Sequence, residues 1–90
     1  MLEAQVKIIN SLGLHARAAA QLVRLAGRFK CKIKLLRSDN NVVADAKSIL
    51  SVLTLAAPRG TKLKIKVEGA DEREALQSVV EMFADGFGEL

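Results

Sequence analysis

The sequence predicts an α+β domain of two layers, in which helices cover one face of a β-sheet. Three segments alternate apolar and polar residues, as strands do when one face is buried and the other meets water. Other segments repeat their apolar residues at helical spacing. Ninety residues, of which 50% are hydrophobic, suffice for one domain with a modest core. We therefore expect a single domain over residues 1–90, with the order β-α-β-β-α-β-α.

The first third of the chain predicts a strand and a helix. Residues 2–8 alternate as a half-buried strand, and a turn-rich link follows at 10–13. The first helix then runs from Ala16 to about Arg28, and its core-facing stripe is Ala19, Leu22, Val23 and Ala26. Another face of this helix carries a polar stripe, which is a plain solvated surface unless a partner docks there: Arg17, Gln21, Arg24 and Arg28.

The middle of the chain predicts a hairpin and a short helix. Residues 31–35 and 42–44 are two strands joined by a turn of Ser, Asp and Asn residues. A short helix runs from Ser48 to about Leu55, and Ser48 can cap its start. This helix is apolar nearly all round, so it is either sunk in the core or an interface. On the second reading some of three side chains are exposed: Ile49, Leu50 and Leu53.

The last third predicts a strand at 62–67 and a long final helix. Asp71 could cap this helix, with Glu74 completing a capping-box pattern. Gly86 and Gly88 end it. The water-facing side of the predicted sheet is polar and rich in lysine: Glu3, Gln5, Lys7, Lys32, Lys34, Lys62, Lys64 and Lys66.

Composition and charge exclude several classes of protein. One cysteine and one histidine predict no internal disulfide, no metal centre and no cofactor, and Cys31 suits a small buried hydrophobe. No signal peptide or membrane span is visible, which favours a cytoplasmic protein without membrane insertion. The net charge of +4 would suit nucleic acid, but the predicted strands lack the aromatic residues on which bases stack. We expect a basic surface for acidic proteins instead.

The only histidine, His15, lies where a loop becomes the first helix. The first backbone N–H groups of a helix have no partner inside it, and together with the helix dipole they attract anions. The N–H groups of Ala16 and Arg17, with the Arg17 guanidinium, could hold a phosphoryl group on the imidazole. Both positive features favour the neutral, nucleophilic ring. A histidine that merely ends the loop is the alternative.

The segment from Asn10 to Arg17 resembles the active-site signature of HPr, the histidine phosphocarrier family of the bacterial phosphotransferase system. Residues 46–50 resemble that family's regulatory-serine segment, and the likeness covers essentially the whole chain. The family's usual proline after the arginine is Ala18 here, but alanine is an excellent helix former, so the helix should persist. The resemblance implies an open-faced β-sandwich, with a four-stranded antiparallel sheet and three helices on one face.

The resemblance also implies a function. His15 would accept a phosphoryl group from phosphorylated Enzyme I and pass it to a histidine of an Enzyme IIA component, with Arg17 stabilising the phosphate. Ser48 would be a regulatory phosphorylation site for HPr kinase/phosphorylase. The protein would be a cytoplasmic monomer serving sugar transport, and not an enzyme, because its partners must reset it. The expected docking residues are Arg24, Arg28, Ile49, Leu50 and Leu53.

Two other functions stay open from the residues alone. One is a regulatory HPr-like binding module, of a nitrogen branch or a paralogue, that uses phosphorylation only as a signal. The other is a small nucleic-acid-binding α+β domain.

Overall fold

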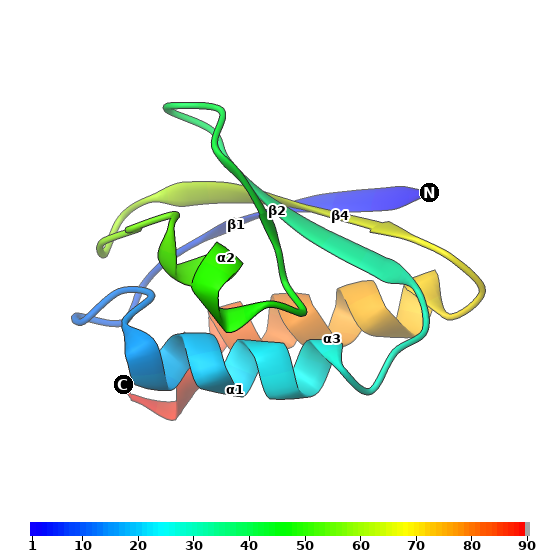
Figure 1. Cartoon of the computed structure of the whole chain (residues 1–90). Helices are drawn as coiled ribbons and strands as arrows, with labels where there is room; N and C mark the ends of the chain where they lie inside the picture. The colour runs from blue at the N-terminus through cyan, green and yellow to red at the C-terminus, as the bar shows by residue number, and fades with distance from the viewer. Residues whose placement is uncertain (90) are drawn as a thin grey trace.

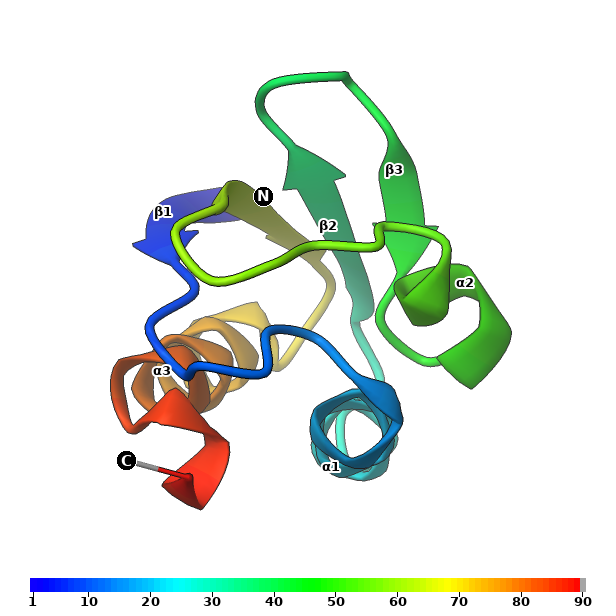
Figure 2. The ribbon, with the colours of Figure 1, turned by 90° about the vertical axis from the view of Figure 1, so that its left-hand side faces the viewer.

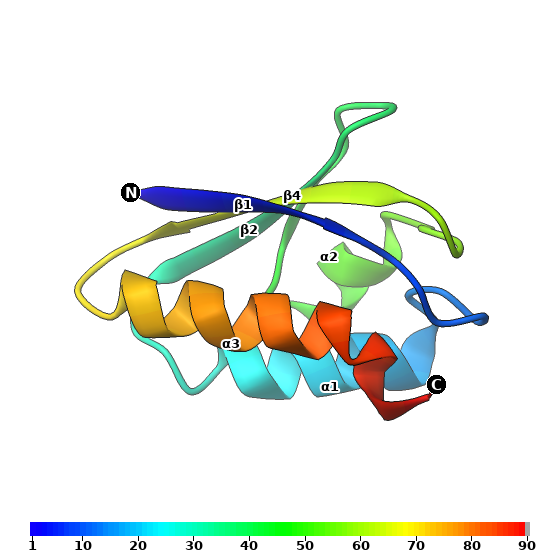
Figure 3. The ribbon, with the colours of Figure 1, turned by 180° about the vertical axis from the view of Figure 1, so that it is seen from behind.

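The computed structural model describes residues 1–89 and contains a four-stranded sheet with helices packed beneath it (Figure 1). Seen from behind in Figure 3, α1 and α3 run side by side under the sheet. The predicted order is confirmed by the elements, which are β1 (Leu2–Lys7), α1 (Ala16–Ala26), β2 (Lys32–Arg37), β3 (Val43–Asp45), α2 (Ile49–Leu53), β4 (Lys62–Glu68), α3 (Glu72–Ala84) and a 3-10 turn, η1 (Gly86–Gly88).

The sheet is antiparallel at each of its pairings, and its strand order is β1-β4-β2-β3. Ile65 of β4 lies opposite Ala4 on one side and Leu35 on the other, and its side chain is buried beneath the sheet. The residues that alternate with these form the outer face. Two pairs of lysines lie directly opposite one another on that face, namely Lys7 with Lys62 and Lys34 with Lys66.

The core lies between the sheet and the helices. Burying a large apolar side chain stabilises the fold by about 1.5–3 kcal/mol. The predicted stripe of α1 is confirmed for three of its four residues, because Val23 is only half-buried. Ala18 is fully buried inside α1, so the helix persists without the proline. The largest fully buried side chains include Phe83, Ile8, Leu22, Ile33, Leu35, Leu55, Leu63 and Ile65.

The start of α3 differs from the prediction. Asp71 precedes the helix, but within the described residues its side chain makes no capping hydrogen bond. Its carboxylate accepts instead from the backbone N–H groups of Lys30, at 2.8 Å, and Cys31, at 2.9 Å. These bonds, with that from Lys30 foremost, lower the pKa of Asp71. The capping-box prediction was wrong because a contact with a distant segment takes the carboxylate, and Glu72 rather than Glu74 bonds the backbone of Gly69.

Cys31 is buried, as expected of a small hydrophobic residue. Burial raises the pKa of its thiol, and the neighbouring Asp71 raises it further. None of the described helices is long and apolar enough to cross a membrane. Residues 1–89 also bring together no group of three side chains suited to a metal ion.

Figure 2 faces the end of the molecule at which α1 begins. The loop before α1, the segment that leads into β4 and the turn after α3 gather at this end. Segments from the beginning, middle and end of the sequence therefore surround the start of α1.

Candidate functional site

His15 is the residue that caps α1. Its backbone is extended, with φ −75° and ψ 178°, and its Nδ1 accepts a hydrogen bond from the Arg17 N–H at 3.3 Å. The His15 carbonyl accepts the first helical hydrogen bond, from the Ala19 N–H at 2.8 Å. The sequence placed His15 at the helix start correctly. The structure adds that the ring itself is the cap, so Nδ1 faces the N–H groups of the first turn.

The loop before His15 is held tightly against residues 57–58. Gly13 has a φ of +65°, and a Cβ at this position would lie 2.5 Å from the Ala57 carbonyl oxygen. A side chain therefore does not fit there without moving the backbone. The Leu14 N–H donates to the same carbonyl at 3.0 Å, and the Leu14 side chain is buried. The loop therefore enters the helix along a fixed path.

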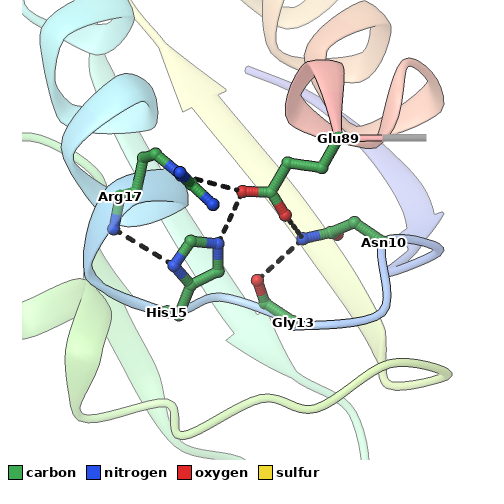
Figure 4. A network of polar contacts seen from close by, with 5 residues as sticks. All are labelled: Asn10, Gly13, His15, Arg17 and Glu89. Carbon is green, nitrogen blue, oxygen red and sulfur yellow. Dashed lines mark hydrogen bonds and ion pairs between the residues drawn. The ribbon is translucent and has the colours of Figure 1, made fainter.

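A carboxylate from the far end of the chain reaches the other side of the ring (Figure 4). Glu89 Oε2 lies 2.6 Å from His15 Nε2 and 3.4 Å from Arg17 Nε. Glu89 Oε1 accepts a hydrogen bond from Asn10 Nδ2 at 2.9 Å. Asn10 Nδ2 also donates to the Gly13 carbonyl at 2.8 Å. Asn10 thus ties the loop before His15 to the turn after α3.

Glu89 is held as an anion. The hydrogen bond from Asn10 lowers the pKa of Glu89, and the His15 ring and the Arg17 guanidinium lower it further. The Glu89 carboxylate therefore lies beside the ring together with the Arg17 guanidinium. The sequence predicted the helix start and Arg17 beside the ring, but not Glu89, which lies 74 residues away along the chain.

Glu89 reaches the ring because the chain reverses after α3. Gly86, Phe87 and Gly88 have φ angles of 59°, 57° and 74°, in the left-handed region. This region is unfavourable for a bulky residue, but Phe87 is buried and its ring packs edge-on against Phe83, with centroids 4.9 Å apart. Packing therefore stabilises the turn. The sequence predicted only that the helix ends at these glycines; an aromatic residue between two glycines was the signal for a packed reversal.

The residues predicted to dock a partner come from the α1 and α2 regions. Arg24 is exposed on α1, and the Arg17 side chain is 66% exposed. Arg28 is exposed too, but it lies beyond the helix, which ends at Ala26 instead of about Arg28 as predicted. The predicted exposure on α2, which contacts α1, is confirmed. Leu12, in the loop before His15, is also exposed, and the sequence argument missed it. The exposed apolar side chains of this loop and of α2, with their exposed fractions, are Leu12 62%, Ile49 39%, Leu50 75% and Leu53 36%.

Ser48 is the residue that caps α2. Its backbone is extended, and its Oγ accepts a hydrogen bond from the Ser51 N–H at 3.3 Å. The capping prediction is therefore confirmed, although the helix spans only Ile49–Leu53 instead of continuing to about Leu55.

This geometry fits a class of protein that carries an anionic group on histidine. One ring nitrogen of His15 faces the helix start and the other is fixed by a carboxylate, while the Arg17 guanidinium is exposed beside the ring. The comparisons with known proteins name the family within this class. The family model PTS-HPr, described as "PTS HPr component phosphorylation site", matches residues 2–85.

Known relatives agree with this match over nearly the full chain. The phosphocarrier protein HPr of Pseudomonas aeruginosa is 47% identical over 85 residues, covering 94% of this chain and 93% of the relative. The phosphocarrier protein HPr of Cupriavidus necator is 45% identical over 89 residues, covering 99% and 98%.

A solved structure shows the same fold. The crystal structure of HPr-C-His from Thermoanaerobacter tengcongensis aligns with a TM-score of 0.92 and 37% identity, covering 100% of this chain and 99% of that one. The chain therefore belongs to the HPr family, the phosphocarrier proteins of the phosphotransferase system. Its sheet and three helices form the open-faced sandwich of HPr structures.

Proposed function

We propose that this protein accepts a phosphoryl group on His15 from phosphorylated Enzyme I and passes it to a histidine of an Enzyme IIA component. One observation carries the proposal: the lone pair of Nδ1 faces the first N–H groups of α1, at 3.3 Å from the Arg17 nitrogen. A phosphoryl group on Nδ1 would bring its oxygens to the N–H groups of Ala16 and Arg17. A helix start is a favourable place for such an anion.

The transfer is a displacement at phosphorus. The Nδ1 lone pair forms the new N–P bond while the N–P bond to the donor imidazole breaks, and the donor ring keeps that bonding pair. Charge in the transition state spreads over the three phosphoryl oxygens. The Arg17 guanidinium and the N–H groups of Ala16 and Arg17 would bear that charge. His15 returns to its starting state only when a second partner takes the group, so the protein is a carrier and not a catalyst.

Partners would dock on the surface around His15, and the protein would act as a cytoplasmic monomer in sugar transport, as its HPr relatives suggest. The exposed Arg24 and Arg28 suit an acidic partner, and the exposed apolar side chains of α2 suit the centre of an interface. Ser48 lies at the edge of those side chains. A phosphate on its Oγ would place a charge of about −2 against them, so Ser48 is a regulatory site in this proposal.

A labelling experiment tests the proposal. Incubation with Enzyme I, Mg²⁺ and labelled phosphoenolpyruvate should give one acid-labile, alkali-stable phosphoryl group per chain. His15→Ala should take none, and Ser48→Ala, which leaves His15 intact, should take the wild-type amount. Label that persists in His15→Ala would contradict the assignment.

The isolated phosphoprotein should then transfer its label to an Enzyme IIA. A protein that is phosphorylated on His15 but passes nothing on would be a signalling module instead. Ala18, in place of the family's usual proline, is the departure that keeps this second candidate open.

A further inference from the structure

We propose that Glu89, aimed by Asn10, is a positioning residue that keeps the proton on His15 Nε2 and so makes Nδ1 the nucleophile. The inference rests on the proposed transfer at His15, and it concerns which ring nitrogen reacts and in which charge state. Glu89 lies 74 residues from His15 along the chain, and Asn10 lies in the loop before α1, outside the helix that carries Arg17.

The hydrogen bonds around the ring select one tautomer. A neutral imidazole has one N–H and one lone pair. The contact of 2.6 Å between Nε2 and the Glu89 carboxylate requires the proton on Nε2, and the bond accepted from the Arg17 N–H requires the lone pair on Nδ1. The bond to the carboxylate is short and charge-assisted, whereas that at Nδ1 is long, at 3.3 Å. The carboxylate is therefore the stronger determinant of the tautomer.

The same carboxylate acts on the phosphorylated ring. When the N–P bond forms at Nδ1 and the proton remains on Nε2, the ring becomes a cation, and Glu89 lies in position to neutralise it. In the onward transfer the N–P bond breaks and the ring takes the bonding pair. A ring that keeps its Nε2 proton leaves as neutral imidazole, which is a better leaving group than imidazolate. Glu89 therefore keeps the loaded carrier ready to donate.

The buried side chain of Asn10 holds the Glu89 carboxylate in place. Its side chain is completely buried, and its Oδ1 has no hydrogen-bond partner within the described residues. A buried amide oxygen without a partner costs stability, so an asparagine at this position needs another reason. The two hydrogen bonds that Asn10 Nδ2 donates give this reason, because they connect Glu89 Oε1 to the loop at Gly13.

Within residues 1–89, the charged groups that contact the ring or lie beside it come from two parts of the chain. Glu89 comes from the turn after α3, and Arg17 comes from α1 together with the N–H groups of the helix start. The loop before His15 contributes the neutral Asn10 and Gly13. Arg17 lies 3.4 Å from Glu89 and is mostly exposed, so its guanidinium can turn to the phosphoryl group while Glu89 stays on Nε2.

The first test reads the tautomer in the unphosphorylated protein. ¹⁵N NMR of the single imidazole at about pH 8.5, well above the reference value of about 6.5, reports the proton on each nitrogen. Wild type should show the Nε2–H tautomer alone, and Glu89→Ala should show a mixture. Glu89→Gln should also give a mixture, because its single amide oxygen can take the place of the oxygen that faces Asn10 or of the one that faces His15, but not of both. An unchanged tautomer in Glu89→Ala would overturn the proposal.

The second test reads the charge of the phosphorylated ring. Spontaneous hydrolysis of the isolated phosphoprotein is measured across pH, since the protonated ring loses its phosphoryl group faster. In Glu89→Gln the midpoint of this profile should move to lower pH by about half to one unit, because the neutral amide no longer stabilises the cation. A profile that coincides with wild type would contradict the charge role.

A matched control is Glu72→Gln at the start of α3. It removes the charge of another paired carboxylate, which lies 3.1 Å from the Met1 amino group. Its tautomer and hydrolysis profile should equal those of wild type.

The NMR test needs no phosphoryl transfer, so failure of Enzyme I to load the wild-type protein would reject the proposed function separately. Asn10→Ser, which keeps a small polar side chain, should loosen the Glu89 contact and give part of the Glu89→Ala mixture.

Discussion

The starts of α1 and α2 share one local geometry and differ in what surrounds it. At α1 the cap atom is His15 Nδ1, and at α2 it is Ser48 Oγ; each accepts a backbone N–H at 3.3 Å. Each is also the atom proposed to take a phosphoryl group. Around His15 the chain adds a carboxylate and a guanidinium, from Glu89 and Arg17. Around Ser48 it adds the exposed side chains of Ile49 and Leu50.

In the proposed function, this difference separates a transfer site at His15 from a regulatory site at Ser48. A cap needs only a short stretch of sequence, whereas the proposed transfer also uses the contact between the ring and Glu89, which is 74 residues away along the chain. A phosphate at His15 would meet the Arg17 guanidinium and the helix start, and in the proposal it is exchanged between partners. A phosphate at Ser48 would meet apolar side chains that a partner must cover, and its effect would be to block docking.

The largest expected effect comes from placing a negative charge at Ser48, the residue that caps α2. Ser48→Asp should keep or slightly raise thermal stability, because aspartate caps a helix as well as serine does. It should slow phosphorylation of His15 by Enzyme I about tenfold or more, which corresponds to about 1.4 kcal/mol of lost docking energy. Thermal unfolding and the rate of phosphate acceptance measure the two effects.

Ser48→Ala is the matched control for this prediction. It should lose about 1 kcal/mol of stability with the cap and leave transfer nearly intact. If Ser48→Asp accepts phosphate as fast as wild type, α2 does not dock the partner.

A smaller effect is expected on the α1 side of the docking surface. Arg24→Glu and Arg28→Glu should slow association with Enzyme I several-fold at low salt and less at high salt, because screening weakens steering. Both side chains are exposed, so stability should hardly change. Stopped-flow association at two ionic strengths measures this, with Arg73→Glu, an exposed arginine on α3, as the control. If Arg73→Glu slows association equally, the effect comes from net charge alone, and Arg24 and Arg28 do not face the partner.

A substitution at Asp71, which precedes α3, should change stability without changing phosphoryl transfer. The pKa of Asp71 is lowered in the folded protein, foremost by the Lys30 N–H, so its ionised form stabilises the fold above the unfolded value of about 3.9. This contribution is lost as pH falls through that value toward the folded pKa. Asp71→Asn should be less stable at pH 7 and should lose less further stability on acidification. Denaturant unfolding between about pH 7 and 3 tests this; parallel curves for the two proteins would contradict it.

The sequence predicts those features that depend on neighbouring residues. Alternation placed three of the four strands, and the hairpin pattern placed the short strand at 42–44. One short segment placed His15 and Arg17 at a helix start. Asn10 and Glu89 were missed because their role depends on the reversal around Phe87, which brings the end of the chain to its beginning. Asp71 shows the same limit. Its sequence pattern predicts a cap, but its carboxylate instead accepts from the distant N–H groups of Lys30 and Cys31.

The central claim is that the cap atom of α1 is the nucleophile. ¹⁵N and ³¹P NMR of the protein phosphorylated by Enzyme I identifies the ring nitrogen that is bonded to phosphorus. The structure predicts phosphorus on Nδ1 and the proton retained on Nε2, beside Glu89. Phosphorus on Nε2 would contradict the account.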